Sequence, residues 1–194
     1  MRKPRRGTPR GLDGQMAVPF RDRGEEHEDL GLAGYLMFVE EPDSKGIRGA
    51  LFCVNGRGEP VDFSFSRIDV ASSFLWRAGD ARRHAITALS KALFTASSVQ
   101  PTLLLSLADE VPPRVFTEDI EVHLPLCRVA APGAIAHSVN ESAESLGEAL
   151  HLFWVGEPPE PDSAARRLLD ALNARQLATE PFERSAAGVE EAFA

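Results

Sequence analysis

A β-hairpin predicted over residues 46–68 constrains the fold of this chain more than any other stretch of its sequence. Two runs of strand-forming residues flank an Asn-Gly-Arg-Gly turn, and Asn and Gly accept the positive φ that tight hairpin turns need. The first run, 50–54, is apolar at every position, which predicts an inner strand covered on both faces. The second run alternates, with Val61, Phe63 and Phe65 on one face and polar residues on the other, which predicts a strand with one buried face.

The apolar patterns around the hairpin predict an α/β (α+β) domain. A short apolar run before the hairpin completes an antiparallel meander of three strands, and an amphipathic helix with apolar residues at spacings of three and four follows it. The predicted order is β-β-β-α-β-(α)-β with C-terminal helices, and Pro125 predicts an edge position or a bulge in the last strand. These elements are predicted at 34–39, 46–68, 80–96, 102–107, 114–119 and 120–129, while 146–155 suits either a strand or a short helix. The predicted core comprises Leu36, Phe38, Leu51, Cys53, Val61, Phe63, Phe65, Ile86, Leu89, Leu93, Leu103, Leu105 and Leu107.

Composition divides the chain into three parts. Residues 1–30 are basic and lack apolar periodicity, which predicts a flexible tail. The α/β domain is predicted over 31–156. A proline linker and helical appendage follow over 157–194, and such an appendage either packs back on the domain or docks on a partner.

Charge is distributed unevenly along the chain. The first 23 residues hold seven basic residues against two acidic ones, whereas the remainder holds 14 against 27. An acidic body repels a nucleic-acid backbone, so nucleic acid is a possible partner chiefly for the basic cluster Arg2, Lys3, Arg5 and Arg6. No signal sequence opens the chain and no run approaches the length of a membrane span, which predicts a cytoplasmic protein with reduced cysteines and no membrane contact.

Carboxylates at the ends of predicted strands form one candidate catalytic set, Glu40, Asp62, Asp109 and Glu110. The predicted element order resembles that of ribonuclease-H-like folds, in which acidic residues on rigid elements hold two divalent cations for phosphodiester cleavage. Mg²⁺ would be the cofactor of such a site. However, the apolar run of the first strand contains no acidic residue, and the helix carries none after Asp80. A two-metal site would therefore be short of ligands.

Other kinds of chemistry lack the required spacing. His123 and Cys127 lie four residues apart in a predicted strand, which separates them by roughly 13 Å. The sequence contains no CxxC or HExxH pair, no GxSxG elbow and no Walker loop, and turn geometry accounts for the glycines of the hairpin. No metal site and no cofactor are therefore expected.

Because each catalytic arrangement fails on spacing, we predict a non-catalytic protein-interaction or regulatory module, a small subunit or adaptor rather than an enzyme. Its protein partner would bind the C-terminal helices, the apolar segment 74–76 or both, and two arginines at the start of the main helix could instead meet an acidic partner or a phosphate. One alternative is a metal-dependent nuclease of ribonuclease-H-like topology, and another is a nucleic-acid-associated accessory protein that acts through its basic tail. The predicted binding residues are Phe74, Leu75, Trp76, Arg82, Arg83, Leu168 and Leu172.

Overall fold

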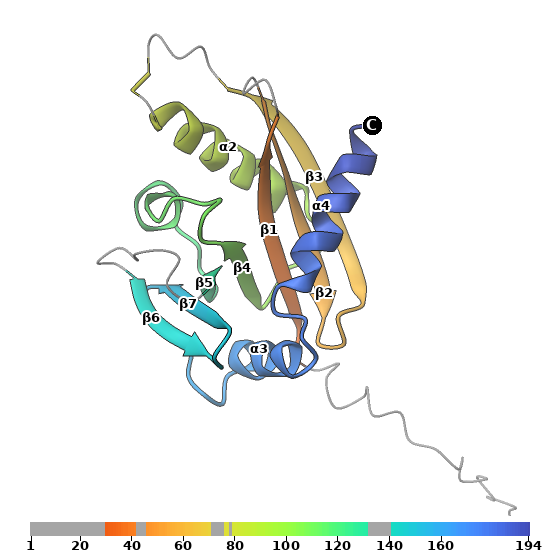
Figure 1. Cartoon of the computed structure of the whole chain (residues 1–194), viewed down its shortest axis with the longest axis vertical. Coiled ribbons are helices and arrows are strands. Elements are labelled where there is room, and N and C mark those ends of the chain that lie inside the picture. The colour runs from red at the N-terminus through yellow and green to blue at the C-terminus, as the bar shows by residue number, and fades with distance from the viewer. Residues whose placement is uncertain (1–29, 42–45, 71–75, 78, 132–140) are drawn as a thin grey trace, which may run out of the picture.

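The computed structural model describes residues 30–41, 46–70, 76–77, 79–131 and 141–194. They form a mixed α/β fold around a seven-stranded sheet of order β3-β2-β1-β4-β5-β7-β6 (Figure 1). The contacts β1–β4 and β4–β5 are parallel, and all other neighbouring strands run antiparallel. The strands are β1 (Leu32–Glu40), β2 (Gly46–Asn55), β3 (Pro60–Asp69), β4 (Leu103–Leu107), β5 (Leu126–Ala130), β6 (Glu141–Leu146) and β7 (Leu150–Val155). The helices are α2 (Asp80–Ala96), the π-helical turn η2 (Val115–Asp119), α3 (Ala164–Ala174) and α4 (Glu180–Ala192).

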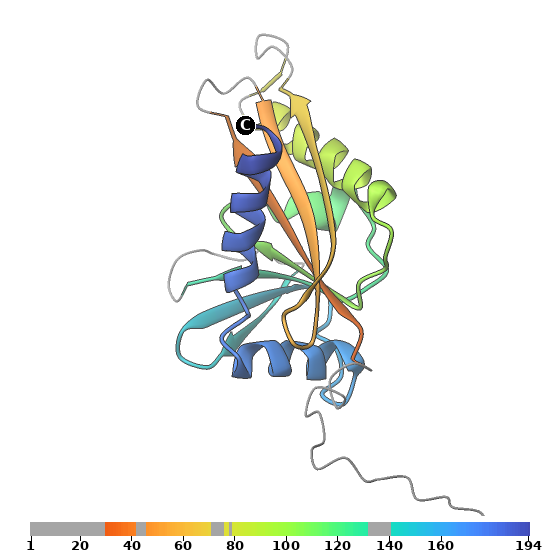
Figure 2. The same cartoon turned by 90° about the vertical axis from the view of Figure 1, so that its right-hand side faces the viewer.

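Helices cover both faces of the sheet, and the described residues form a large apolar core on each face. On one face α2 and η2 pack against Leu36, Leu51 and Leu104. On the other face α3 and α4 pack against a core that includes Tyr35 and Trp154. Figure 2 shows α2 and α4 on opposite sides of the β1–β3 strands. Strands β1 and β2 are therefore buried on both faces, as the continuous apolar run in β2 predicted.

The hairpin is present over β2 and β3, with a register irregularity between Cys53 and Val54. The side chain of Asn55 accepts hydrogen bonds from the amides of Arg57 and Glu59, which closes the turn. The prediction that Val61 and Phe65 are core residues is wrong, because each is 46% exposed. Alternation groups these side chains on one face, but β3 is the edge strand, where the covering layer ends.

The second half of the sheet differs from the prediction. Strand β5 starts only after Pro125 and lies inside the sheet between β4 and β7, so the expected edge position is wrong. The Pro125 carbonyl still accepts a hydrogen bond from the Leu104 amide, and proline needs no donor at this position. The ambiguous stretch 146–155 is the second half of an antiparallel hairpin, whose first strand, β6, was not predicted.

Both C-terminal helices pack back onto the sheet. The Tyr35 hydroxyl donates a 2.7 Å hydrogen bond to the Leu177 carbonyl in the connection between α3 and α4. Arg184 of α4 donates to the Gly58 carbonyl in the hairpin turn at 3.0 Å. The 157–194 segment therefore shares one core with the strands.

Candidate functional site

The edge of the sheet where β1, β4 and β5 end is the natural place for a ligand site in this topology. These strands are parallel, so their carboxyl ends meet at one edge. The chain order also reverses between β1 and β4, and ligands of open α/β sheets bind at such switch points. Two of the predicted catalytic carboxylates, Asp109 and Glu110, directly follow β4 there.

Glu110 forms a hydrogen bond with the part of β1 that extends beyond the end of β4. Strand β4 pairs with β1 only as far as Leu36, and the Glu110 carboxylate accepts a 3.0 Å hydrogen bond from the Phe38 amide beyond that point. Burial, together with the nearby Asp109 charge, raises the pKa of Glu110 from 4.5 to about 7, while the Phe38 amide opposes this shift. Glu110 is thus a half-buried carboxyl group that titrates near neutral pH.

Asp109 is exposed and lines a cavity of about 480 Å³. The other residues that line this cavity are apolar or neutral, among them Leu107, Val129 and Thr179. A nuclease centre of the predicted kind would need several carboxylates at this edge. The lining of this cavity contains one carboxylate, that of Asp109.

A buried arginine that the sequence analysis missed holds the turn carrying both carboxylates. Arg128 of β5 is 1% exposed and donates hydrogen bonds to the carbonyls of Ala108 at 2.5 Å and Val111 at 3.0 Å. Its guanidinium also donates to both carboxylate oxygens of Glu141, at 2.8 and 2.9 Å. The signal available in the sequence was a lone arginine inside the apolar run Leu-Cys-Arg-Val-Ala.

The other two predicted carboxylates do not join this site. Glu40 forms an ion pair with Arg82 at the start of α2. Asp62 of β3 lies opposite Cys53 of β2, and Cys53 lies opposite Gly34 near the beginning of β1. Asp62 therefore lies toward the opposite edge of the sheet. Its carboxylate accepts hydrogen bonds from three serine hydroxyls, at 2.9 to 3.3 Å. Within the described ranges, no group of three or more His, Cys, Asp or Glu side chains is arranged to hold a metal ion.

The residues predicted to bind a partner are dispersed. Trp76 is 38% exposed and its ring lies 5.0 Å from that of His84. Leu168 and Leu172 are fully buried beneath α3, so a partner would reach them only if α3 left the sheet. Phe74 and Leu75 lie outside the described residues, as do Arg2, Lys3, Arg5 and Arg6.

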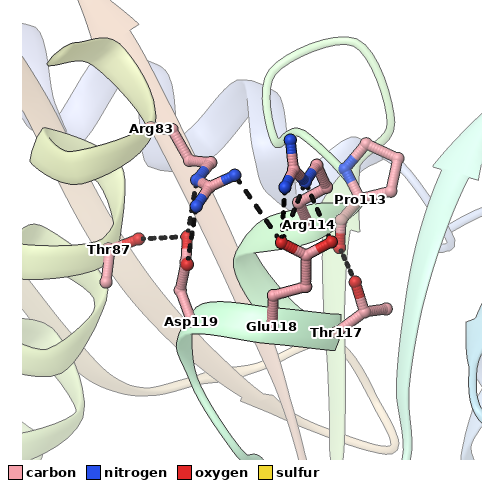
Figure 3. A network of polar contacts seen from close by, with 7 residues as sticks. All are labelled: Arg83, Thr87, Pro113, Arg114, Thr117, Glu118 and Asp119. Atoms are coloured by element: carbon pink, nitrogen blue, oxygen red, sulfur yellow. Dashed lines mark hydrogen bonds and ion pairs between the residues drawn. The ribbon is translucent and has the colours of Figure 1, made fainter. Parts of the chain in front are cut away.

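Arg83 belongs to a polar network that joins α2 to η2 (Figure 3). Its guanidinium lies 2.9 Å from the Asp119 carboxylate, which also accepts a hydrogen bond from the Thr87 hydroxyl. Glu118, the neighbouring carboxylate, binds Arg114 at 2.8 Å and lies 3.8 Å from Arg83. These contacts fix η2 against the exposed side of α2.

Comparison with models of protein families and with curated proteins finds no match. Among solved structures, the fold is similar to endonuclease V from Streptomyces avermitilis, with a TM-score of 0.53 and 15% identity over 84% of this chain and 83% of that one. Endonuclease V from Bacillus subtilis aligns with a TM-score of 0.45 and 12% identity over 75% of this chain and 73% of that one. Marinitoga piezophila Argonaute, in complex with guide RNA and target DNA, aligns with a TM-score of 0.36 and 9% identity over 73% of this chain and 25% of that one.

The prediction of a non-catalytic protein-interaction module is wrong in the light of the first likeness. The shared fold covers most of both chains and is the fold of the Streptomyces endonuclease V, which agrees better with the topology of the alternative prediction. No described helix is long and apolar enough to cross a membrane. The cytoplasmic location stays a prediction.

Proposed function

We propose that this chain is a nuclease-like protein that acts on nucleic acid. The fold likeness to the Streptomyces endonuclease V is the observation that carries the proposal. The position of Asp109 and Glu110 supports it, because both follow β4 at the switch point of the sheet, where ligands of such folds bind.

The two carboxylates would have different roles. Glu110 has a pKa of about 7, which suits a group that gives or takes a proton near neutral pH. Asp109 faces solvent at the neighbouring cavity, where it can accept hydrogen bonds from a bound ligand. Arg128 would position both residues by holding the carbonyls of Ala108 and Val111.

Divalent cations supply charge neutralisation at the phosphate in nucleases that use them. The described residues do not fit a two-cation centre, because they assemble no three-ligand group. We therefore assign no step of the proposed reaction to a metal.

Cleavage of end-labelled DNA and RNA, single-stranded and double-stranded, with and without added Mg²⁺, tests the proposal. We expect cleavage by the wild-type chain, lowered about a hundredfold in E110Q, the size of effect expected on losing a proton-transfer group. D109N should also lower cleavage, because it removes the charge of a carboxylate that lines the cavity. D62N is the matched control, because Asp62 lies toward the opposite edge of the sheet and should leave cleavage unchanged. Absence of both binding and cleavage for all four substrates would refute the proposal.

A second candidate function is nucleic-acid binding without cleavage. It is favoured by the lack of a three-ligand group among the described residues. The basic cluster Arg2, Lys3, Arg5 and Arg6 would contribute to such binding. Tight binding of a polynucleotide that stays intact over long incubation with Mg²⁺ would favour this candidate over the first.

A further inference from the structure

A second cavity, of about 660 Å³, lies between α2 and η2 and shares no residue with the cavity at Asp109. It is lined mainly by charged side chains, together with one tryptophan. The proposed nuclease-like site does not use it. Its composition and internal pairing indicate which ligand it fits.

Four of its charged groups neutralise one another. Arg83 pairs with Asp119, and Arg114 pairs with Glu118, in the network of Figure 3. These four side chains form part of the cavity lining, and their charges sum to zero.

Two further cations remain available for a ligand. The side chains of Arg77 and Lys91 are exposed, line the cavity, and form no hydrogen bond or ion pair with any other described residue. Asp80 is the remaining acidic residue of the lining. The cavity thus carries a net positive charge on a chain whose formal net charge is -8. An anionic group is attracted here although the molecule as a whole repels it.

An aromatic surface lies beside these cations. The rings of Trp76 and His84 are inclined by 32° with centroids 5.0 Å apart, and Trp76 remains 38% exposed. An exposed indole next to basic side chains is the arrangement with which proteins bind single-stranded nucleic acid, because the base stacks on the ring while the cations contact phosphates.

We propose that the α2–η2 cavity binds a nucleotide unit of single-stranded nucleic acid, with its base on Trp76 and its phosphates at Arg77 and Lys91. This inference rests on the proposed function, since it adds a binding surface to a protein that acts on nucleic acid. The cavity would bind a single strand through side chains that do not line the cavity at Asp109.

Tryptophan fluorescence gives a local test. The chain has two tryptophans, and Trp154 is 1% exposed, with its indole donating to Glu144. Quenching on titration with a short oligothymidylate therefore reports on Trp76. We expect saturable quenching in the wild-type chain. W76L lacks this reporter, so its binding is measured with a dye-labelled oligothymidylate, and we expect it to be about tenfold weaker, as on loss of one stacked base contact.

Charge removal gives a matched pair of variants. R77Q/K91Q should raise the Kd about tenfold or more and reduce the dependence of binding on salt, because two phosphate contacts are lost. R167Q/R175Q removes the same charge from exposed positions on and just after α3, on the other face of the sheet, and should change the Kd less than twofold. All four arginine and lysine side chains are exposed, so thermal melts should show both variants folded.

The outcomes separate this inference from the proposed function. Equal weakening by the two double variants would mean that only net charge matters and would overturn the inference. Equally tight binding of polyglutamate would do the same, by assigning the cavity to acidic peptides. Wild-type binding of oligothymidylate that R77Q/K91Q leaves unchanged would overturn the inference alone, whereas no binding of any polynucleotide would refute the proposed function itself.

Discussion

Glu110 makes the stability of the protein depend on pH in an unusual direction. Its pKa rises from 4.5 in the unfolded chain to about 7 in the fold, so the folded state binds the extra proton between these values. Stability therefore falls as pH rises from 4.5 to 7, by at most about 1.4 kcal/mol per pH unit. We expect E110Q to lose this slope in urea unfolding measured at several pH values. E190Q, which removes an exposed carboxylate from α4, should keep it, and an unchanged slope in E110Q would contradict the assignment.

Arg128 is the residue whose removal should damage the fold most directly. Its guanidinium is fully enclosed and neutralises the buried Glu141, so R128M leaves that carboxylate without this partner. We expect a loss of about 3–5 kcal/mol of unfolding free energy, the range for breaking a buried ion pair. R166M serves as the comparison, because Arg166 and its partner Glu144 are 20% and 29% exposed, so the loss of this ion pair should cost less. Equal losses for the two variants would show that burial does not set the cost.

At the scale of elements, the hairpin turn is fastened to the connection between α3 and α4. Gly58 has a φ of +81°, and a Cβ at this position would overlap the side chain of Leu177. Gly147 has a φ of +66° with open space around it, so G147A reports backbone strain alone, about 1 kcal/mol. We expect G58A to cost clearly more than G147A in urea unfolding, since it adds a clash to the same strain. Equal costs would mean that Leu177 moves aside freely.

The elements that were predicted correctly are those whose signals are local. Helix α2 begins and ends as the apolar spacing predicts, and the β2–β3 hairpin follows from its turn residues. Strand β6 was missed because its carboxylates resemble a loop in sequence, whereas Glu141 and Glu144 find arginine partners in β5 and α3. Such pairings across the fold leave no periodic signal.

The sequence identified individual residues of the candidate site, but not which of them lie together in the fold. Strand ends identified Asp109 and Glu110 as carboxylates that follow a buried strand. Whether Asp62 would join them depended on strand order and direction, which place it level with the beginning of β1. Likewise, nothing near Arg128 in sequence shows that its guanidinium reaches the carbonyls of the β4 turn.

At the scale of the whole molecule, a sheet covered on both faces should unfold as one unit. Leu89 of α2 and Leu172 of α3 are 2% and 0% exposed and belong to the two different cores. We expect L89A and L172A each to cost about 2–5 kcal/mol, the range for truncating a buried leucine. Because the strands contribute side chains to both cores, loss of either core should destabilise the same cooperative unit. Coincident far-ultraviolet and tryptophan fluorescence melts in both variants would agree with this, since Trp154 lies in the core beneath α3. A separate early transition in L172A alone would instead mean that the 157–194 segment unfolds as an independent appendage.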